Sequence, residues 1–291
     1  MTFKELVRPT NRNIRLLVGL LLIGLFCIQC TRTEAFKQSS FISVIDGKVL
    51  GHNDPIVVKR LETLARTDHV ALLNDCLRHC RQNYRDYTCT LIKQERIGGQ
   101  LGREQWIDVK FLGQPFSVAM KWTRNAPIGD QVLYVEGRYD NKMLVKPKGL
   151  LGNLVGTVLR QPDGSDALKN TLRPVNLFGF ERNMQNLLQV YAQARKNGDL
   201  KEGFDGYREV AGRKALLLTR FLPAAHDYPA QKTLIFIDAE YLVPICVEAY
   251  DWNDKLSSRY LYKDVKFNVG LASDDFLPEA NGLPEPADAR N

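Results

Sequence analysis

The sequence lacks the motifs that mark most enzyme active sites. Its 291 residues contain no Gly-x-Ser-x-Gly turn for a nucleophilic serine, no His-Glu-x-x-His zinc motif and no glycine-rich phosphate loop. Two carboxylate pairs, Glu95 with Glu104 and Asp238 with Glu240, are better explained as charges at strand edges and turns. The four histidines are scattered without partners at catalytic spacing: His52, His69, His79 and His226. The sequence therefore predicts neither catalytic residues nor a cofactor.

The chain also lacks an apolar run long enough to cross a membrane. Leu16–Ile28 follows a basic segment, but it is shorter than the ~20 apolar residues that a spanning helix needs. This arrangement predicts a signal peptide over residues 1–35, with small residues that favour cleavage before Phe36. A lipid anchor on Cys30 and an uncleaved N-terminal anchor are the alternatives. We therefore expect an exported protein, either periplasmic or associated with the cell envelope.

Concentrated basic charge is missing too. The chain has 40 Lys and Arg against 33 Asp and Glu, a net charge of +7. Removal of residues 1–35, with five basic and two acidic side chains, leaves a net charge of about +4. Nucleic-acid binding requires a focused basic patch, and no run of Lys and Arg supplies one. Nucleic acid is therefore not an expected partner.

Cysteine is scarce, and four cysteines follow residue 35: Cys76, Cys80, Cys89 and Cys246. An exported chain can form disulfides. Cys76 and Cys80 lie one helical turn apart, so both can face the same strand. We predict one disulfide from this pair to Cys89 or Cys246, with buried free thiols as the alternative. A metal site would recruit His79, but no second ligand pair at zinc spacing exists, so no metal is expected.

Hydrophobic periodicity, by contrast, is abundant. Residues 56–82 show helical spacing with a break near Thr67-Asp68, where Asp68 is a candidate N-cap. After Tyr84, roughly 75 residues read as short strands separated by turns, which is typical of an antiparallel meander. A second helix is predicted over residues 181–197, with Gly198 as its stop. Strands then resume and end in a closing hairpin, Val243–Tyr250 with Ser257–Phe267.

These patterns divide the chain into four parts. Residues 1–35 are the predicted signal peptide, residues 36–55 a leader segment, residues 56–277 a single domain and residues 278–291 a disordered tail. The tail is predicted from its three prolines and several acidic groups. Within the domain, residues 149–156 are apolar and glycine-rich and interrupt the strands.

Large apolar side chains recur at alternate positions of several predicted strands and on one face of the second helix. A packed core explains most of them. Several strands are nevertheless apolar on both faces, and a strongly curved sheet covered by helices would leave a groove suited to acyl chains. We therefore take nine residues as candidate ligand-binding residues: Phe116, Val118, Met120, Trp122, Leu187, Tyr191, Leu234, Phe236 and Val247.

Two stretches resemble a known family. The stretch Pro127–Gly137 after Trp122 and the closing stretch Leu242–Pro278 resemble the LolA/LolB-like lipoprotein-carrier fold. More narrowly, the chain is similar to an uncharacterised family of secreted bacterial proteins, domain of unknown function 1571. The resemblance implies a mainly β, α+β fold: a strongly curved antiparallel half-barrel with helices over its concave face. A departure is the middle region, residues 149–200, which is longer than the lid of a plain carrier.

The resemblance also implies a function. It predicts non-catalytic binding or carriage of a hydrophobic ligand, a lipid or lipoprotein acyl chains, in the bacterial cell envelope. The alternative is a structural or regulatory module that interacts with an envelope protein partner through a LolA-like domain. An unrecognised hydrolase is the third hypothesis, although no catalytic motif supports it.

Overall fold

The computed structural model describes residues 44–45, 48–49, 54–127, 129–149 and 156–284, which fall in one unit, Ser39–Asn291. The predicted signal peptide with Cys30, residues 150–155 and the end of the predicted tail lie outside the described residues. So does most of the predicted leader. In its described part, β1 (Val44–Ile45) pairs antiparallel with β2 (Lys48–Val49).

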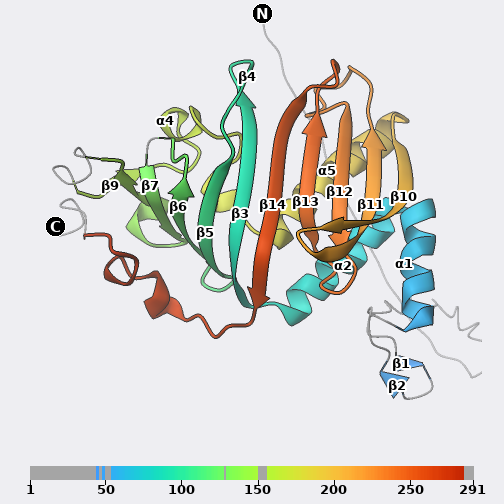
Figure 1. The fold of residues 1–291 in the computed structure, drawn as a ribbon, viewed down its shortest axis with the longest axis horizontal. Coiled ribbons are helices and arrows are strands. Elements are labelled where there is room, and N and C mark those ends of the chain that lie inside the picture. The colour runs from blue at the N-terminus through green and yellow to red at the C-terminus, as the bar shows by residue number, and fades with distance from the viewer. Residues whose placement is uncertain (1–43, 46–47, 50–53, 128, 150–155, 285–291) are drawn as a thin grey trace, which may run out of the picture. The chain divides into compact units, whose positions relative to one another are not determined.

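The described residues form one large antiparallel sheet of 12 strands (Figure 1). The first half is a meander of β3, β5, β6, β7, β8 and β9, and the second half is a meander of β10 to β14. The pairing of β14 with β3 joins the halves, and β4 extends β3 in a short hairpin. The first meander has the following bounds: β3 Asp86–Ile97, β4 Gln100–Leu101, β5 Gln105–Leu112, β6 Ser117–Arg124, β7 Gly129–Val135, β8 Met143–Pro147 and β9 Val158–Arg160. The second has these: β10 Lys201–Val210, β11 Arg213–Phe221, β12 Lys232–Asp238, β13 Pro244–Tyr250 and β14 Leu256–Phe267.

Three helices pack on one face of this sheet: α1 (Pro55–Thr67), α2 (His69–Asn83) and α5 (Phe180–Asn197). The predicted break at Asp68 is confirmed, since the Asp68 carboxylate accepts a hydrogen bond from the Ala71 N–H at 3.0 Å and caps α2. The predicted stop at Gly198 is confirmed as well. Its φ of 74° is a left-handed conformation that glycine adopts without steric cost.

The main core lies between these helices and the sheet. Alternate strand residues face the helices, as Ile235 and Ile237 of β12 do, because successive side chains of a strand point to opposite faces. They meet buried helix residues such as Leu72, Leu73 and Met184. The curved antiparallel sheet with helices on one face confirms the predicted α+β fold class.

The opposite face of the sheet carries a second, smaller core. After β14 the chain continues through the short helices η3 (Ser273–Phe276) and η4 (Glu279–Asn281) and packs on β5 to β8. Phe276 and Leu283, 1% and 3% exposed, contact a group of outward-facing strand residues: Leu112, Ala119, Leu133, Val135 and Leu144. Residues 278–284, predicted as the start of a disordered tail, therefore form part of the structure, because Leu283 covers apolar strand surface. We call residues 273–284 the C-terminal strap.

Candidate ligand-binding site

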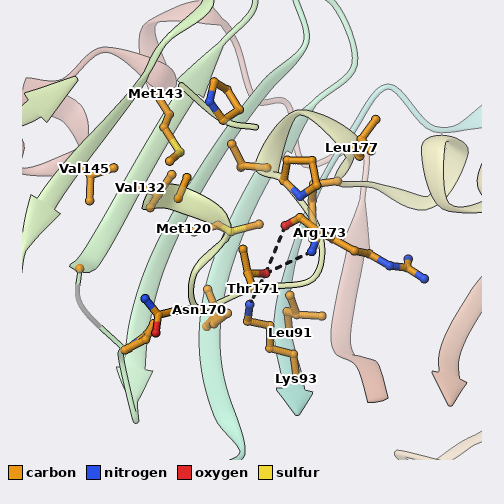
Figure 2. Close-up of a pocket in the computed structure, with 18 of the residues that line it drawn as sticks. Leu91, Lys93, Met120, Val132, Met143, Val145, Asn170, Thr171, Arg173 and Leu177 are labelled. Atoms are coloured by element: carbon orange, nitrogen blue, oxygen red, sulfur yellow. Dashed lines mark hydrogen bonds between the residues drawn. The ribbon is translucent and has the colours of Figure 1, made fainter. Parts of the chain in front are cut away.

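A cavity of about 400 Å³ lies on the helix-covered side of the sheet. Its floor is formed by the first meander and by β14, and its roof by residues 160–178, which contain α4 (Ser165–Leu168) and the short helix η2 (Val175–Leu177). We call residues 160–178 the cover segment. Figure 2 shows the floor residues Met120 and Leu91 close to Thr171 and Arg173 of the cover segment. The volume falls in the range of about 300–1,000 Å³ that is usual for small-molecule sites.

The floor is apolar because neighbouring strands place apolar side chains at paired positions on the same face of the sheet. Residues directly opposite each other in an antiparallel pair lie on the same face. Two rows of such residues cross the floor. The first row contains Tyr262 of β14, Leu91 of β3, Ile107 of β5 and Trp122 of β6. The second row contains Met120 of β6, Val132 of β7 and Val145 of β8. Met143 lies two residues before Val145 on β8 and lines the floor beside it. The floor therefore offers hydrocarbon surface from six strands.

A buried polar network joins the floor to the cover segment. Lys93 Nζ donates hydrogen bonds to Glu95 Oε2 and to Thr171 Oγ1, each at 3.1 Å. Glu95 Oε1 accepts hydrogen bonds from the Tyr260 hydroxyl at 2.6 Å and from the Leu172 N–H at 3.2 Å. Burial, with the Glu95 charge next, raises the pKa of Tyr260, so its hydroxyl stays protonated and donates. Because Lys93 and Glu95 are 7% and 3% exposed, this network links the cover segment to β3 away from bulk water.

Charged side chains at the cavity are mostly basic. Among the described residues, the lining includes four cations, Lys93, Arg160, Lys169 and Arg173, and one carboxylate, Asp166. Lys93 forms an ion pair with Glu95, which does not line the cavity, and Arg160 forms an ion pair with Asp166 at 2.9 Å. The described residues give Lys169 and Arg173 no ion-pair partner. The cavity therefore has an excess of positive charge.

Of the nine predicted ligand-binding residues, Met120 and Trp122 line this cavity. Trp122 is held there by a 2.7 Å hydrogen bond from its indole N–H to Gln105 Oε1. Five others belong to the filled part of the core: Phe116, Val118, Leu187, Tyr191 and Val247. The Tyr191 hydroxyl is engaged with His69 Nδ1 at 2.9 Å. Leu234 and Phe236 alternate with the helix-facing residues of β12 and thus lie on the opposite face of the sheet.

Sequence reasoning missed most of the floor, including Leu91, Ile107 and Met143, and the whole cover segment. The strands that carry Val132 and Met143 were predicted, so their alternation was available as a signal. The sequence did not reveal which face of those strands borders a cavity, because the cover segment that forms the roof has no regular hydrophobic period.

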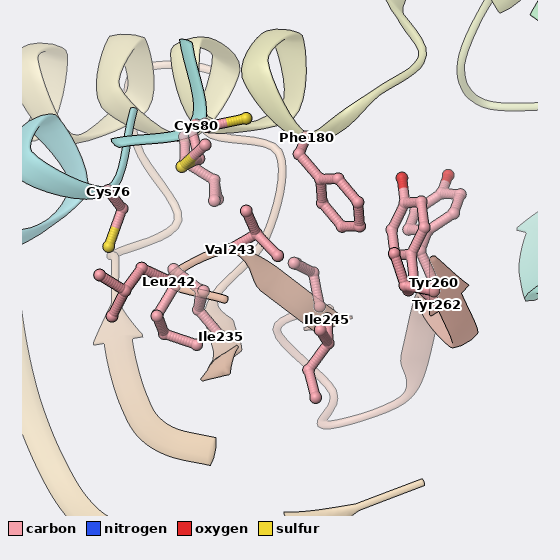
Figure 3. Packing of buried hydrophobic residues seen from close by; sticks show 14 of the residues in the cluster. Cys76, Cys80, Phe180, Ile235, Leu242, Val243, Ile245, Tyr260 and Tyr262 are labelled. Atoms are coloured by element: carbon pink, nitrogen blue, oxygen red, sulfur yellow. The ribbon is translucent and has the colours of Figure 1, made fainter. Parts of the chain in front are cut away.

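The four cysteines after residue 35 are buried and free, so the predicted disulfide does not form. Figure 3 shows Cys76 and Cys80 on α2 among apolar side chains such as Val243. Cys89 faces the same core, but Cys246 packs on the other face of the sheet, because its neighbours on β13 face the helices. Burial raises the pKa of Cys80 and of Cys246 to about 12, which keeps both thiols protonated.

The remaining candidate groups form no second site. Glu104 accepts a hydrogen bond from the Trp106 indole at 2.8 Å and stays apart from the network around Lys93. Asp238 and Glu240 both pair with Arg213 at the end of β12. In the described part of the chain, no three His, Cys, Asp or Glu side chains gather as a metal site. Within the same residues, no helix has the length and apolar character needed to cross a bilayer.

Comparison with known proteins gave one family and several solved structures. The family model described as "Protein of unknown function (DUF1571)" matches residues 84–282. The MucA/MucB complex of Pseudomonas aeruginosa is similar at 18% identity over 74% of this chain and 62% of that chain, with a TM-score of 0.44. This chain thus spans about three fifths of that chain's length.

Two further structures cover nearly all of their own length. The lipoprotein LppX of Mycobacterium tuberculosis is 13% identical over 71% of this chain and 99% of that chain, with a TM-score of 0.35. A LolA superfamily protein of Nitrosomonas europaea is 11% identical over 72% and 98%, with a TM-score of 0.31. No curated protein matches the sequence. The open, curved antiparallel sheet with helices on one face has the architecture that the sequence resemblance implies.

Proposed function

The chain belongs to the DUF1571 family of proteins of unknown function, and we propose that this member binds a hydrophobic ligand without catalysing a reaction. The ligand is a lipid or the acyl chain of a lipoprotein, and it occupies the cavity beneath the cover segment. The signal-peptide pattern of residues 1–35 supports the cell envelope as the place where binding occurs.

The apolar floor of the cavity is the observation that supports this proposal. Its side chains are held by strand pairing, so they can surround an acyl chain without first rearranging. Each buried methylene contributes ~0.8 kcal/mol, and ~1.4 kcal/mol changes a dissociation constant tenfold. Lengthening the acyl chain of the ligand by two methylenes should therefore lower its dissociation constant by about 15-fold, until the cavity is filled.

The polar groups beside the floor favour binding over catalysis. Lys93, Glu95, Thr171 and Tyr260 are hydrogen-bonded to one another, and this mutual engagement fixes the cover segment. Because these contacts explain the polar groups as supports of the cover segment, the network needs no catalytic role. The open cavity also favours a small-ligand site over a purely structural or regulatory module, for which a filled core would be expected.

A cavity-filling substitution tests the proposal. Val132→Phe should occupy the floor, whereas Leu234→Phe adds the same ring on the opposite face of the sheet as a matched control. We expect Val132→Phe to weaken binding of a neutral fluorescent probe, N-phenylnaphthylamine, at least ~10-fold, with an unchanged melting temperature. Leu234→Phe should bind as the wild type does. Denaturing extraction and mass spectrometry should also find bound lipid in the wild-type protein at near-stoichiometric amounts.

Two results would contradict the proposal. One is wild-type protein that neither carries lipid nor binds the probe. The other is a folded Val132→Phe variant that binds the probe as tightly as the wild type, because the ligand would then lie elsewhere.

A further inference from the structure

One amide nitrogen in the cavity wall has no hydrogen-bond partner among the described residues. Asn183 lies in the first turns of α5, lines the cavity and is 2% exposed. Its Oδ1 accepts a hydrogen bond from Arg173 Nη1 at 3.0 Å. Its Nδ2 has no hydrogen bond among the described residues. A buried donor without an acceptor is unfavourable, so a ligand that supplies an acceptor at this point is favoured.

Arg173 places a positive charge beside that amide. Its guanidinium lies 4.5 Å from the centre of the Tyr260 ring and donates to Asn183, so two contacts fix its orientation. No carboxylate in the described residues forms an ion pair with it, whereas Lys93 and Arg160 at the same cavity each have one. A guanidinium presents several N–H donors in one plane, which suits the paired oxygens of a carboxylate or phosphate.

The charged and apolar parts lie at different places in the cavity. Figure 2 shows Arg173 away from Met143 and Val145, with Met120 between them. A molecule that spans this distance needs an apolar chain at one end and an acceptor-rich head at the other.

From this arrangement we propose that the cavity binds an anionic single-chain amphiphile in one orientation. Its carboxylate or phosphate head accepts hydrogen bonds from Arg173 and from Asn183 Nδ2, and its chain lies over Met120, Val132 and Met143. The inference rests on the proposed function, to which it adds the charge of the ligand and the position of its head.

The test compares three probes of equal chain length: myristate, myristyl phosphate and the neutral myristyl alcohol. Wild-type protein should bind at least one of the anionic probes ~10-fold or more tightly than the alcohol, because a charged acceptor strengthens each hydrogen bond. Added salt should reduce this difference in affinity between the anionic probe and the alcohol, since salt screens partly exposed charges. The tighter of the two anions identifies the head group.

Two variants locate the head. Arg173→Gln removes the cation, and Asn183→Asp replaces the amide beside Arg173 by a carboxylate that neutralises Arg173 and repels an anion. Each should weaken binding of the preferred anion ~10-fold or more and leave the alcohol within about twofold. Lys121→Gln is the matched control. It removes one positive charge beside Met120, from an exposed side chain on the opposite face of β6, and should change neither affinity.

The outcomes separate the two proposals. If wild-type protein binds acid, phosphate and alcohol equally, or if Arg173→Gln weakens all three alike, the head-group site is refuted and hydrophobic binding stands. If the wild type binds none of the three and does not bind N-phenylnaphthylamine either, both proposals are refuted.

Discussion

A pair of substitutions on one strand distinguishes a cavity from a filled core. Met120 and Val118 point to the same face of β6, two residues apart. Met120 lines the cavity, whereas Val118 is 0% exposed within the main core, opposite Phe111 on one side and Tyr134 on the other. Glutamate at either position therefore puts the same carboxylate into two different environments.

The two substitutions should differ by several kcal/mol in their effect on the free energy of unfolding. At Val118, the protein loses ~1.5–3 kcal/mol of apolar burial, and desolvation or forced protonation of the carboxylate adds several kcal/mol. That sum is comparable with the total stability of ~5–15 kcal/mol that is typical of a domain. At Met120, water in the cavity of about 400 Å³ can solvate the carboxylate, so the loss should be limited to ~1.5–3 kcal/mol.

Urea denaturation and titration with neutral N-phenylnaphthylamine, measured on the same samples, test this difference. Met120→Glu should remain folded and bind the probe at least ~10-fold more weakly, because the apolar probe would have to displace water from a charge. Val118→Glu should be largely unfolded. Met120→Gln, equal in size and uncharged, separates the effect of charge from that of lost methionine contacts. Equal destabilisation at the two positions, or undiminished binding by Met120→Glu, would refute the reasoning.

Two further predictions concern buried titratable groups. Burial lowers the pKa of His69 below its ordinary 6.5, although the Glu202 carboxylate opposes the shift, so below about pH 6.5 the unfolded chain takes up a proton that the folded protein resists. The free energy of unfolding should therefore fall between pH 7 and pH 5 in urea titrations, and His69→Gln should flatten this slope; an unchanged slope would contradict the assignment. Protein lacking residues 1–35 should react with about four equivalents of a thiol reagent when denatured without reductant and with almost none when native, because all four cysteines are buried and free; two equivalents after denaturation would reveal a disulfide.

Local signals in the sequence were sufficient to predict the helices and most strands. Asp68 caps α2 with its own side chain, and Gly198 ends α5 through a left-handed φ, so each boundary depends on residues close in the chain. The closing hairpin around Asp251 is equally local, since the Asp251 carboxylate accepts hydrogen bonds from the N–H groups of Asn253 and Lys255.

The faces of the strands were harder to predict because both sides of the sheet are covered. Ser117, Val118, Ala119 and Met120 are all buried, so the first half of β6 does not alternate between buried and exposed residues. The helices and cover segment bury one face, and the C-terminal strap buries the other. A sequence period of two identifies residues that share a face, but it does not reveal what covers that face.

The cavity depends on contacts between distant residues, which explains why the sequence indicated only Met120 and Trp122. Thr171 contacts Glu95 and Lys93 of β3 through side chains that are unremarkable in their own segments. Arg173 and Asn183 likewise meet only because the chain folds back from the cover segment into α5. No local rule of capping or periodicity predicts such contacts.

The joining of the two meanders through β14 and β3 has a consequence for the order of folding. Each meander pairs strands that are neighbours in the chain, but Ile92 pairs with Leu261 across the junction. Contacts between such distant residues form slowly, because closing a long loop costs entropy before the new contacts stabilise it. Tyr260 and Tyr262 of β14 complete the cavity wall, so a chain that emerges from its N-terminus has no finished binding site until its last strand is available. A nascent chain would therefore remain unable to take up a ligand until nearly all of it had been made.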